Sequence, residues 1–210
     1  MTVFYNQFAN RNLDRIGALS DGLFAIAMTL IVLEIQVPAL PHGSGDEDLA
    51  RALVDLGPRF VTYLLSFLTL GIFWNGQQTQ LSYVREGNRD LAWLELLFLA
   101  IIALFPFTTS LLADHIDLRL ALALYWLNIF LAGSALYVIW EYVDRTGLTR
   151  DGTAPAVGAA IRRRIGIAQL LYFVGLVIAL LIGTYPAIAW IVLVQLNYAI
   201  APRIGFLHRL

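Results

Sequence analysis

The chain has 210 residues, of which 59% are hydrophobic and only 14% are charged, and its formal net charge is −1. Because a soluble domain carries about 25% charged residues, this composition indicates an integral membrane protein. The near-zero charge, without a basic face, argues against a nucleic-acid partner. The absence of cysteine excludes disulfides and thiolate metal sites.

Six apolar runs are long enough to cross a membrane as helices, which takes about 20 predominantly apolar residues each. They lack the alternation of outer-membrane barrel strands. The sequence therefore predicts an all-α bundle of six transmembrane helices in a single domain over residues 1–210. The predicted spans are 16–37, 60–82, 91–112, 119–140, 165–183 and 185–201.

The last two spans are divided only by Thr184, Tyr185 and Pro186. We expect two helices joined by a tight turn, with a single re-entrant hairpin as the alternative. Two connections are long, 38–59 and 141–164, and we expect both to be loops. Residues 1–15 lack the apolar core and cleavage site of a signal peptide, so we expect the first span to remain in the mature protein.

The arginines predict the orientation of the chain. Eleven of the fourteen fall on one side when successive spans cross in alternate directions, and only Arg51, Arg59 and Arg119 fall on the other. Cytoplasmic loops carry the excess of arginine. We therefore predict a multi-pass protein of the bacterial inner membrane with both termini in the cytoplasm.

The first span carries a polar pair, Ser20-Asp21, inside its apolar run. A carboxylate within a membrane helix costs roughly 2.5–3.5 kcal/mol on insertion scales and by default indicates a functional site. Arg15 lies six positions before Asp21, which is not one helical face. We therefore expect each of the two charges to find its partner on a neighbouring helix or at the interface, where a packing role is the plainer interpretation.

Beyond the polar pair, Ile26, Leu30 and Leu33 follow at spacings of four and three residues, which places them in one stripe on a helix. A polar entrance followed by a narrow aliphatic stripe is typical of a pore-lining helix with a hydrophobic constriction. The competing interpretation is a lipid-facing or packing surface. Thr29, at the edge of the stripe, can bond back to its own helix or present its oxygen to an ion.

The next two spans add polar groups at similar depth. The second ends in Trp74, Gln77 and Gln78, and the Trp74 indole can donate to Asp21 or Ser20. The third holds Glu95, which is either neutral through desolvation or, as we expect, interfacial. Pro106 should kink this third helix.

Nothing in the sequence indicates an enzyme or a metal site. The histidines lie far apart at positions 42, 115 and 208 and match no zinc spacing. The chain contains no HExxH, GxSxG or glycine-rich phosphate-binding motif. We expect no cofactor and no catalytic residue.

These residues together resemble the prokaryotic members of the transmembrane-protein-175 family, the lysosomal and bacterial potassium channels. That family has an Arg-x-x-x-Phe-Ser-Asp signature at the start of its first helix, which appears here as Arg15 to Asp21 with Leu19 in place of phenylalanine. Other segments that look like the family are Gly22 to Leu30, Ser66-Phe67, Phe73-Trp74 and Pro106-Phe107.

The resemblance implies a homotetramer with one six-helix repeat per chain and a pore lined by the first helix. Carried over by position, Ile26 would form the narrowest ring, Leu30 and Leu33 would continue it outward, and Thr29 would tune the preference for potassium. The residues that would position the first helix are Arg15, Ser20, Asp21 and Trp74. This chain departs from the family, which often has histidines at the positions of Gln77 and Gln78 and asparagine at that of Glu95.

We therefore predict a potassium-permeable cation channel that conducts passively, whose partners are potassium ions, the lipid bilayer and further copies of itself. Two alternatives stay open. A proton-coupled secondary transporter would titrate Asp21 and Glu95, and would show internal repeats and broken mid-membrane helices. A non-conducting scaffold would use the stripe of Ile26, Leu30 and Leu33 for packing only.

Overall fold

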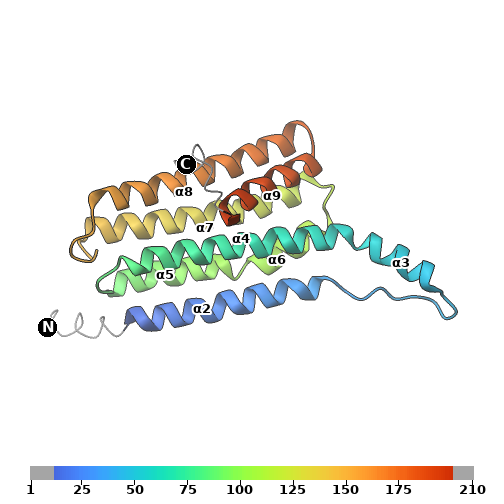
Figure 1. Ribbon diagram of the computed structural model, residues 1–210, viewed down its shortest axis with the longest axis horizontal. Helices are drawn as coiled ribbons and strands as arrows, with labels where there is room; N and C mark the ends of the chain where they lie inside the picture. The colour runs from blue at the N-terminus through green and yellow to red at the C-terminus, as the bar shows by residue number, and fades with distance from the viewer. Residues whose placement is uncertain (1–11, 201–210) are drawn as a thin grey trace.

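The computed structural model describes residues 12–200, and in this range the chain is helical with short connections. Its long helices lie side by side along one axis (Figure 1). In chain order the elements are α2 (Asn12–Leu30), the 3-10 turn η1 (Ile31–Glu34), α3 (Asp46–Asp55), α4 (Gly57–Ser82), α5 (Arg89–Ile102), α6 (Phe105–Asp114), α7 (Arg119–Arg145), α8 (Pro155–Leu181) and α9 (Thr184–Ile200).

The helices are arranged around α4, which contacts α2, α6, α7 and α9. α2 forms one side of the bundle and α8 the opposite side (Figure 1). The start of α2, the α4–α5 connection and the α7–α8 connection share one end, which we call the arginine-rich end because it carries Arg85, Arg89, Arg145 and Arg150.

Among the described residues, four stretches are long and apolar enough to cross a membrane and match four of the six predicted spans, namely Leu13–Glu34, Arg89–Asp114, Arg119–Arg145 and Pro155–Leu181. α3 and α4, which meet at a bend of 45°, form a fifth candidate when they are counted as one span. α9 coincides with the sixth predicted span. Its 17 described residues extend about 25 Å, less than the roughly 30 Å of hydrocarbon, so the count of six stays a prediction.

The end of the first span differs from the prediction. The α-helix stops at Leu30 and continues as a 3-10 turn to Glu34, so Val37 is not helical. Pro38 disfavours helical backbone at the residue before it. Arg59 also donates from Nη1 to the Glu34 carbonyl oxygen at 3.0 Å, which satisfies a carbonyl group that the end of the helix leaves without a partner.

Both connections that we predicted to be loops are partly helical, so that prediction was wrong. Residues 46–55 of the first form α3, whose start is capped because the Asp48 carboxylate accepts from the Gly45 N–H at 3.1 Å. In the second, α8 begins at Pro155, and Arg162, Arg163 and Arg164 are therefore helical. Proline suits the first helical turn because it needs no N–H there.

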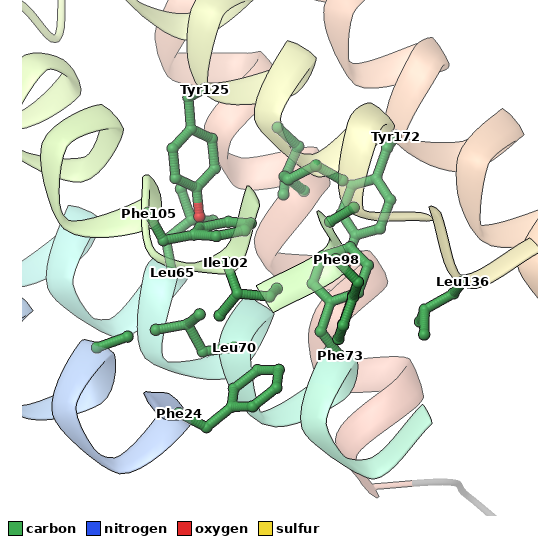
Figure 2. Packing of buried hydrophobic residues seen from close by; sticks show 14 of the residues in the cluster. Phe24, Leu65, Leu70, Phe73, Phe98, Ile102, Phe105, Tyr125, Leu136 and Tyr172 are labelled. Atoms are coloured by element: carbon green, nitrogen blue, oxygen red, sulfur yellow. The ribbon is translucent and has the colours of Figure 1, made fainter. Parts of the chain in front are cut away.

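The third span is interrupted where proline predicted a kink. α5 ends at Ile102 and α6 starts at Phe105, with Pro106 in its first turn. The interior of the bundle beside this break is aromatic (Figure 2). The Phe73 ring lies 6.4 Å from Phe98 and 5.9 Å from Phe105, and Phe24 of α2 lies 6.1 Å from Phe98. Phe24 is therefore the apolar anchor of α2.

A buried polar cluster joins the helices beside these rings, where the Tyr125 ring lies 6.1 Å from Phe105. Ser66 donates to the Tyr125 hydroxyl at 3.1 Å, and Thr109 donates to Ser66 at 2.7 Å. Gln195 of α9 donates to Thr69 at 2.6 Å. Hydroxyl and amide groups bond across helices in this way because hydrocarbon offers them no other partner, so the cluster links α4, α6, α7 and α9.

The two connections at the arginine-rich end are bonded to one another. The Arg85 N–H donates to the Leu148 carbonyl at 2.8 Å, and the Arg150 N–H donates to the Tyr83 carbonyl at 2.8 Å. Arg85 also pairs with Glu86 and Asp151, and the hydrogen bond to Glu86 is the main reason that its pKa is raised. The α4–α5 and α7–α8 connections are thus tethered to each other at the arginine-rich end.

We expect Gly175→Ala to destabilise the protein, because an added methyl group would lie 2.9 Å from Ile191 Cγ1 where α8 packs on α9. Such overpacking costs about 1–3 kcal/mol. Gly166→Ala on the same helix is the matched control, since an added methyl group there meets nothing within 4 Å. Thermal unfolding in detergent should show a lower Tm for Gly175→Ala alone. Equal Tm values would contradict the described α8–α9 packing.

Candidate pore-lining helix

α2 has one face inside the bundle and one outside. The inner face is formed by Ile16, Ser20, Phe24, Ala27 and Ile31, all less than 9% exposed. Their spacing of three or four residues defines a single helical stripe. The predicted constriction residues lie on the other face, so the fold separates the packing surface of α2 from its aliphatic stripe.

The stripe is uncovered in the single chain. Ile26 is 60% exposed, Leu30 43% and Leu33 67%. Residues three apart eclipse one another in a 3-10 turn, so η1 keeps Leu33 in line with Leu30. Thr29 donates its hydroxyl to the Ile26 carbonyl at 2.8 Å and is exposed, which leaves its oxygen lone pairs on the outer face.

A buried hydrogen-bond chain fixes the inner face of α2. Ser20 donates to Gln77 Oε1 on α4, and Gln77 Nε2 donates to Glu95 Oε2 on α5 at 2.7 Å. These three residues are at most 1% exposed. An unpaired polar group would be costly at this depth, so the chain determines which face of α2 points inward.

Asp21, next in sequence, is held at the edge of the same contact. Its Oδ1 accepts from Trp74 Nε1 and from Gln78 Nε2, both on α4 and both at 2.8 Å. Asp21 and Trp74 are exposed, whereas Ser20 beside them is buried. Two adjacent residues of α2 thus bond to α4 in different ways, one inside the bundle and one at its surface.

The opposite end of α2 and η1 is also bonded to neighbouring helices. Ser110 of α6 donates to Glu34 Oε2 at 2.8 Å. Arg59 of α4, which caps the Glu34 carbonyl, pairs with Asp114 of α6 at 2.7 Å. The span that carries the exposed stripe is therefore fixed at both ends and free of protein along its outer face.

Two expectations about this site need correction. Arg15 makes no hydrogen bond or ion pair with any residue of the range 12–200, so it is not joined to Ser20, Asp21 and Trp74 there. Glu95, which we expected at the interface, is 1% exposed. The reason is position: Glu95 lies on the inner face of α5, one turn from buried Leu91 and Leu99, and Gln77 supplies its partner.

Several residues that hold α2 were not predicted as its partners. Gln77 and Glu95 were expected only as possible secondary residues of the site, Gln78 only as a polar group at similar depth, and Arg59 only as a charge that sets the orientation. Ser110 and Asp114 were not predicted to contact this span. The sequence did contain a signal for the pairing of Arg59 with Asp114. The predicted spans place these two residues at the same end of neighbouring helices. Among the described residues no group of three or more histidine, aspartate or glutamate side chains could hold a metal ion.

Comparison with known proteins identifies a family of similar sequences. A family model described as the endosomal/lysosomal potassium channel TMEM175 matches residues 15–106. A potassium channel of Streptomyces collinus is 36% identical over 163 residues, which are 75% of this chain and 78% of that protein. An endosomal/lysosomal proton channel TMEM175 of Gallus gallus is 32% identical over 113 residues, which are 50% of this chain and 22% of the length of that protein.

A solved structure has the same fold. The crystal structure of a lysosomal potassium-selective channel TMEM175 homolog from Chamaesiphon minutus superposes with a TM-score of 0.76 at 25% identity, covering 91% of this chain and 98% of that one. The fold is therefore that of a multi-pass helical channel protein. The chain belongs to the TMEM175 family, which confirms the resemblance indicated by Arg15 to Asp21.

We expect Gln77→Leu to lower the stability of the protein by about 1–3 kcal/mol, because it leaves Ser20 and Glu95 buried without a partner. Gln78→Leu is the matched control, since it removes one of two donors from a carboxylate that solvent reaches. Thermal unfolding in detergent should rank the Tm values as wild type, then Gln78→Leu, then Gln77→Leu. The reverse order of the two variants would show that the buried chain contributes little.

Proposed function

We propose that this protein is a potassium-permeable channel in which four copies of α2 surround a common axis. The observation that carries the proposal is the uncovered aliphatic stripe of Ile26, Leu30 and Leu33 on a span whose opposite face is fixed by polar contacts. Relatives named potassium channels support the choice of ion. Closed rotational symmetry, the usual arrangement of homo-oligomers, would turn one exposed stripe into stacked rings.

In this arrangement Ile26 forms the narrowest ring, and Leu30 and Leu33 continue it towards the outer mouth. Aliphatic side chains cannot replace the hydration shell of an ion as carbonyl oxygens do. Selection then rests on the width of the pore and on partial dehydration, so we expect a modest preference for potassium over sodium. Thr29 adds an oxygen at the edge of the rings and adjusts that preference.

The polar contacts of α2 act as positioning contacts in this proposal. Rotation of α2 about its axis would remove Ile26 from the pore, and it would also break the bonds of Ser20 to Gln77 and of Asp21 to Trp74. The protein lies in the bacterial inner membrane with its arginine-rich end in the cytoplasm, in accord with the arginine bias. The contacts of Ser20 and Asp21 then lie towards the cytoplasmic entrance.

The transporter alternative has less support from the described contacts. Asp21 and Glu95 use separate partners and are not joined to each other by any hydrogen bond within residues 12–200. Proton-coupled carriers typically place their sites at the midplane on broken helices, whereas Asp21 and Glu95 lie nearer the arginine-rich end, and Glu95 is seven residues before the break that follows Ile102. The scaffold alternative would use the stripe for packing only, but within the single chain Ile26 and Leu33 are exposed and do not serve that purpose.

We expect Ile26→Asn to increase ion flux several-fold and to bring the potassium and sodium rates closer together, because an amide at the constriction lowers the cost of wetting it. The assay is passive potassium efflux from liposomes loaded with potassium, with sodium outside. Leu170→Asn on α8 is the matched control, since Leu170 is 62% exposed, Ile26 is 60% exposed, and α8 lies on the opposite side of the bundle (Figure 1).

Three results would contradict this proposal. Wild-type protein that is folded but carries no flux would favour the scaffold. Flux that requires a proton gradient would favour the transporter. An equal effect of Ile26→Asn and Leu170→Asn would mean that the constriction does not lie on α2.

We expect Trp74→Phe to reduce the potassium-to-sodium flux ratio with little change in Tm. The variant keeps an aromatic ring but removes one of two donors to Asp21, so α2 gains rotational freedom while its buried face stays packed. Trp93→Phe on α5 is the control, because Trp93 is 63% exposed and makes no side-chain hydrogen bond to a described residue. An unchanged flux ratio in Trp74→Phe would mean that Asp21 does not position the pore.

A further inference from the structure

A cavity lies on the opposite side of α4 from the α2 contact. α4 and α8 each pack on α7 and on α9, and the space between them forms a cavity of about 310 Å³. Gly76 of α4 and Gly133 of α7 line it, and the Gln169 side chain of α8 occupies the space that a side chain at position 133 would need. None of the residues proposed for the pore contributes to this cavity.

The walls of the cavity are mostly apolar. On α8 the lining residues recur every three or four positions and form one stripe through Ile161, Ile165 and Ala168. The α4 wall presents Ile72 and Phe73 at the deeper end, and Thr79, Gln80 and Tyr83 towards the arginine-rich end. The cavity is therefore apolar in its depth and more polar near one membrane surface.

Arg164 supplies a positive charge to this space. It lines the cavity and also a second hollow of about 190 Å³ between α4 and α9. Its guanidinium carbon lies 5.7 Å from the centre of the Tyr198 ring, and no carboxylate of the described residues pairs with it. Arg162, two residues earlier, differs because it pairs with Asp144 at 2.8 Å.

The position of Arg164 along α8 matches a membrane surface. It directly precedes the uncharged run 165–183, which is long enough to cross most of the hydrocarbon. Its guanidinium therefore lies at headgroup depth, and Ile165, Ala168 and Tyr172 line the cavity at acyl-chain depth. Basic pockets between membrane helices on the cytoplasmic side bind anionic lipid headgroups.

We propose that this cavity is a binding site for an anionic phospholipid of the arginine-rich leaflet. The phosphate pairs with Arg164, and one acyl chain occupies the apolar part between α4 and α8. Thr79, Gln80 and Tyr83 offer hydrogen-bonding groups to the headgroup. A bound lipid would stabilise the position of α4, the helix that carries Trp74 and Gln77 on its other face. Lipid binding itself does not depend on ion conduction.

The test is lipid retention by the full chain. Protein is purified from vesicles of equal parts phosphatidylglycerol and phosphatidylcholine, and retained lipid is counted by native mass spectrometry. Wild type should retain phosphatidylglycerol in preference to phosphatidylcholine. Arg164→Gln should retain about fivefold less, the effect of one basic residue at a membrane surface, whereas Arg164→Lys should retain most of it.

Two further variants make the test specific. Arg163→Gln removes a charge from the exposed neighbour that lines neither cavity, and it should retain lipid as wild type does. Ala168→Phe fills the apolar part and should lose the lipid although Arg164 remains. Equal retention by wild type, Arg164→Gln and Ala168→Phe would overturn the proposal, as would equal retention of the two lipids by wild type. Either result would mean that the cavity is not a site for an anionic lipid.

Discussion

The orientation of α2 depends on a short chain of buried polar groups. Ser20, Gln77 and Glu95 come from three helices, and each needs the others because none reaches water. Apolar packing alone would only weakly determine which face of α2 points into the bundle, because lipid and protein interiors are similarly apolar. Hydrogen bonds are directional, so this chain restricts the rotation of a helix that presents mainly aliphatic side chains on both of its faces.

The two ends of the span are fixed by different chemistry. Near the arginine-rich end, the Ser20 hydroxyl donates to Gln77, and the Asp21 carboxylate accepts from Trp74 and Gln78 of α4. At the other end, Arg59 bonds to the backbone of Glu34 and to Asp114 of α6. Between these points Ile26 and Leu33 on the outer face of α2 are more than half exposed in the described chain, so this face is open to a pore or to a second subunit.

The sequence predicted the helical class and four of the candidate spans because each rests on a long apolar pattern. It failed where a short segment or a single partner decides the structure. α3 has ten residues in a polar connection, and its helical start depends on the Asp48 cap. Glu95 could be read as buried only with knowledge that Gln77 faces it. Two of the positions at which the chain departs from the family pattern, 77 and 95, are thus in direct contact.

The 3-10 turn at the end of the first span has a geometric consequence. A 3-10 turn advances 120° per residue and an α-helix 100°. If residues 31–34 rewound as α-helix, Leu33 would turn by about 60° relative to Leu30 and the segment would shorten by about 0.5 Å per residue. Because Arg59 donates a hydrogen bond to the Glu34 carbonyl oxygen, this contact stabilises the 3-10 winding that aligns Leu33 with Leu30.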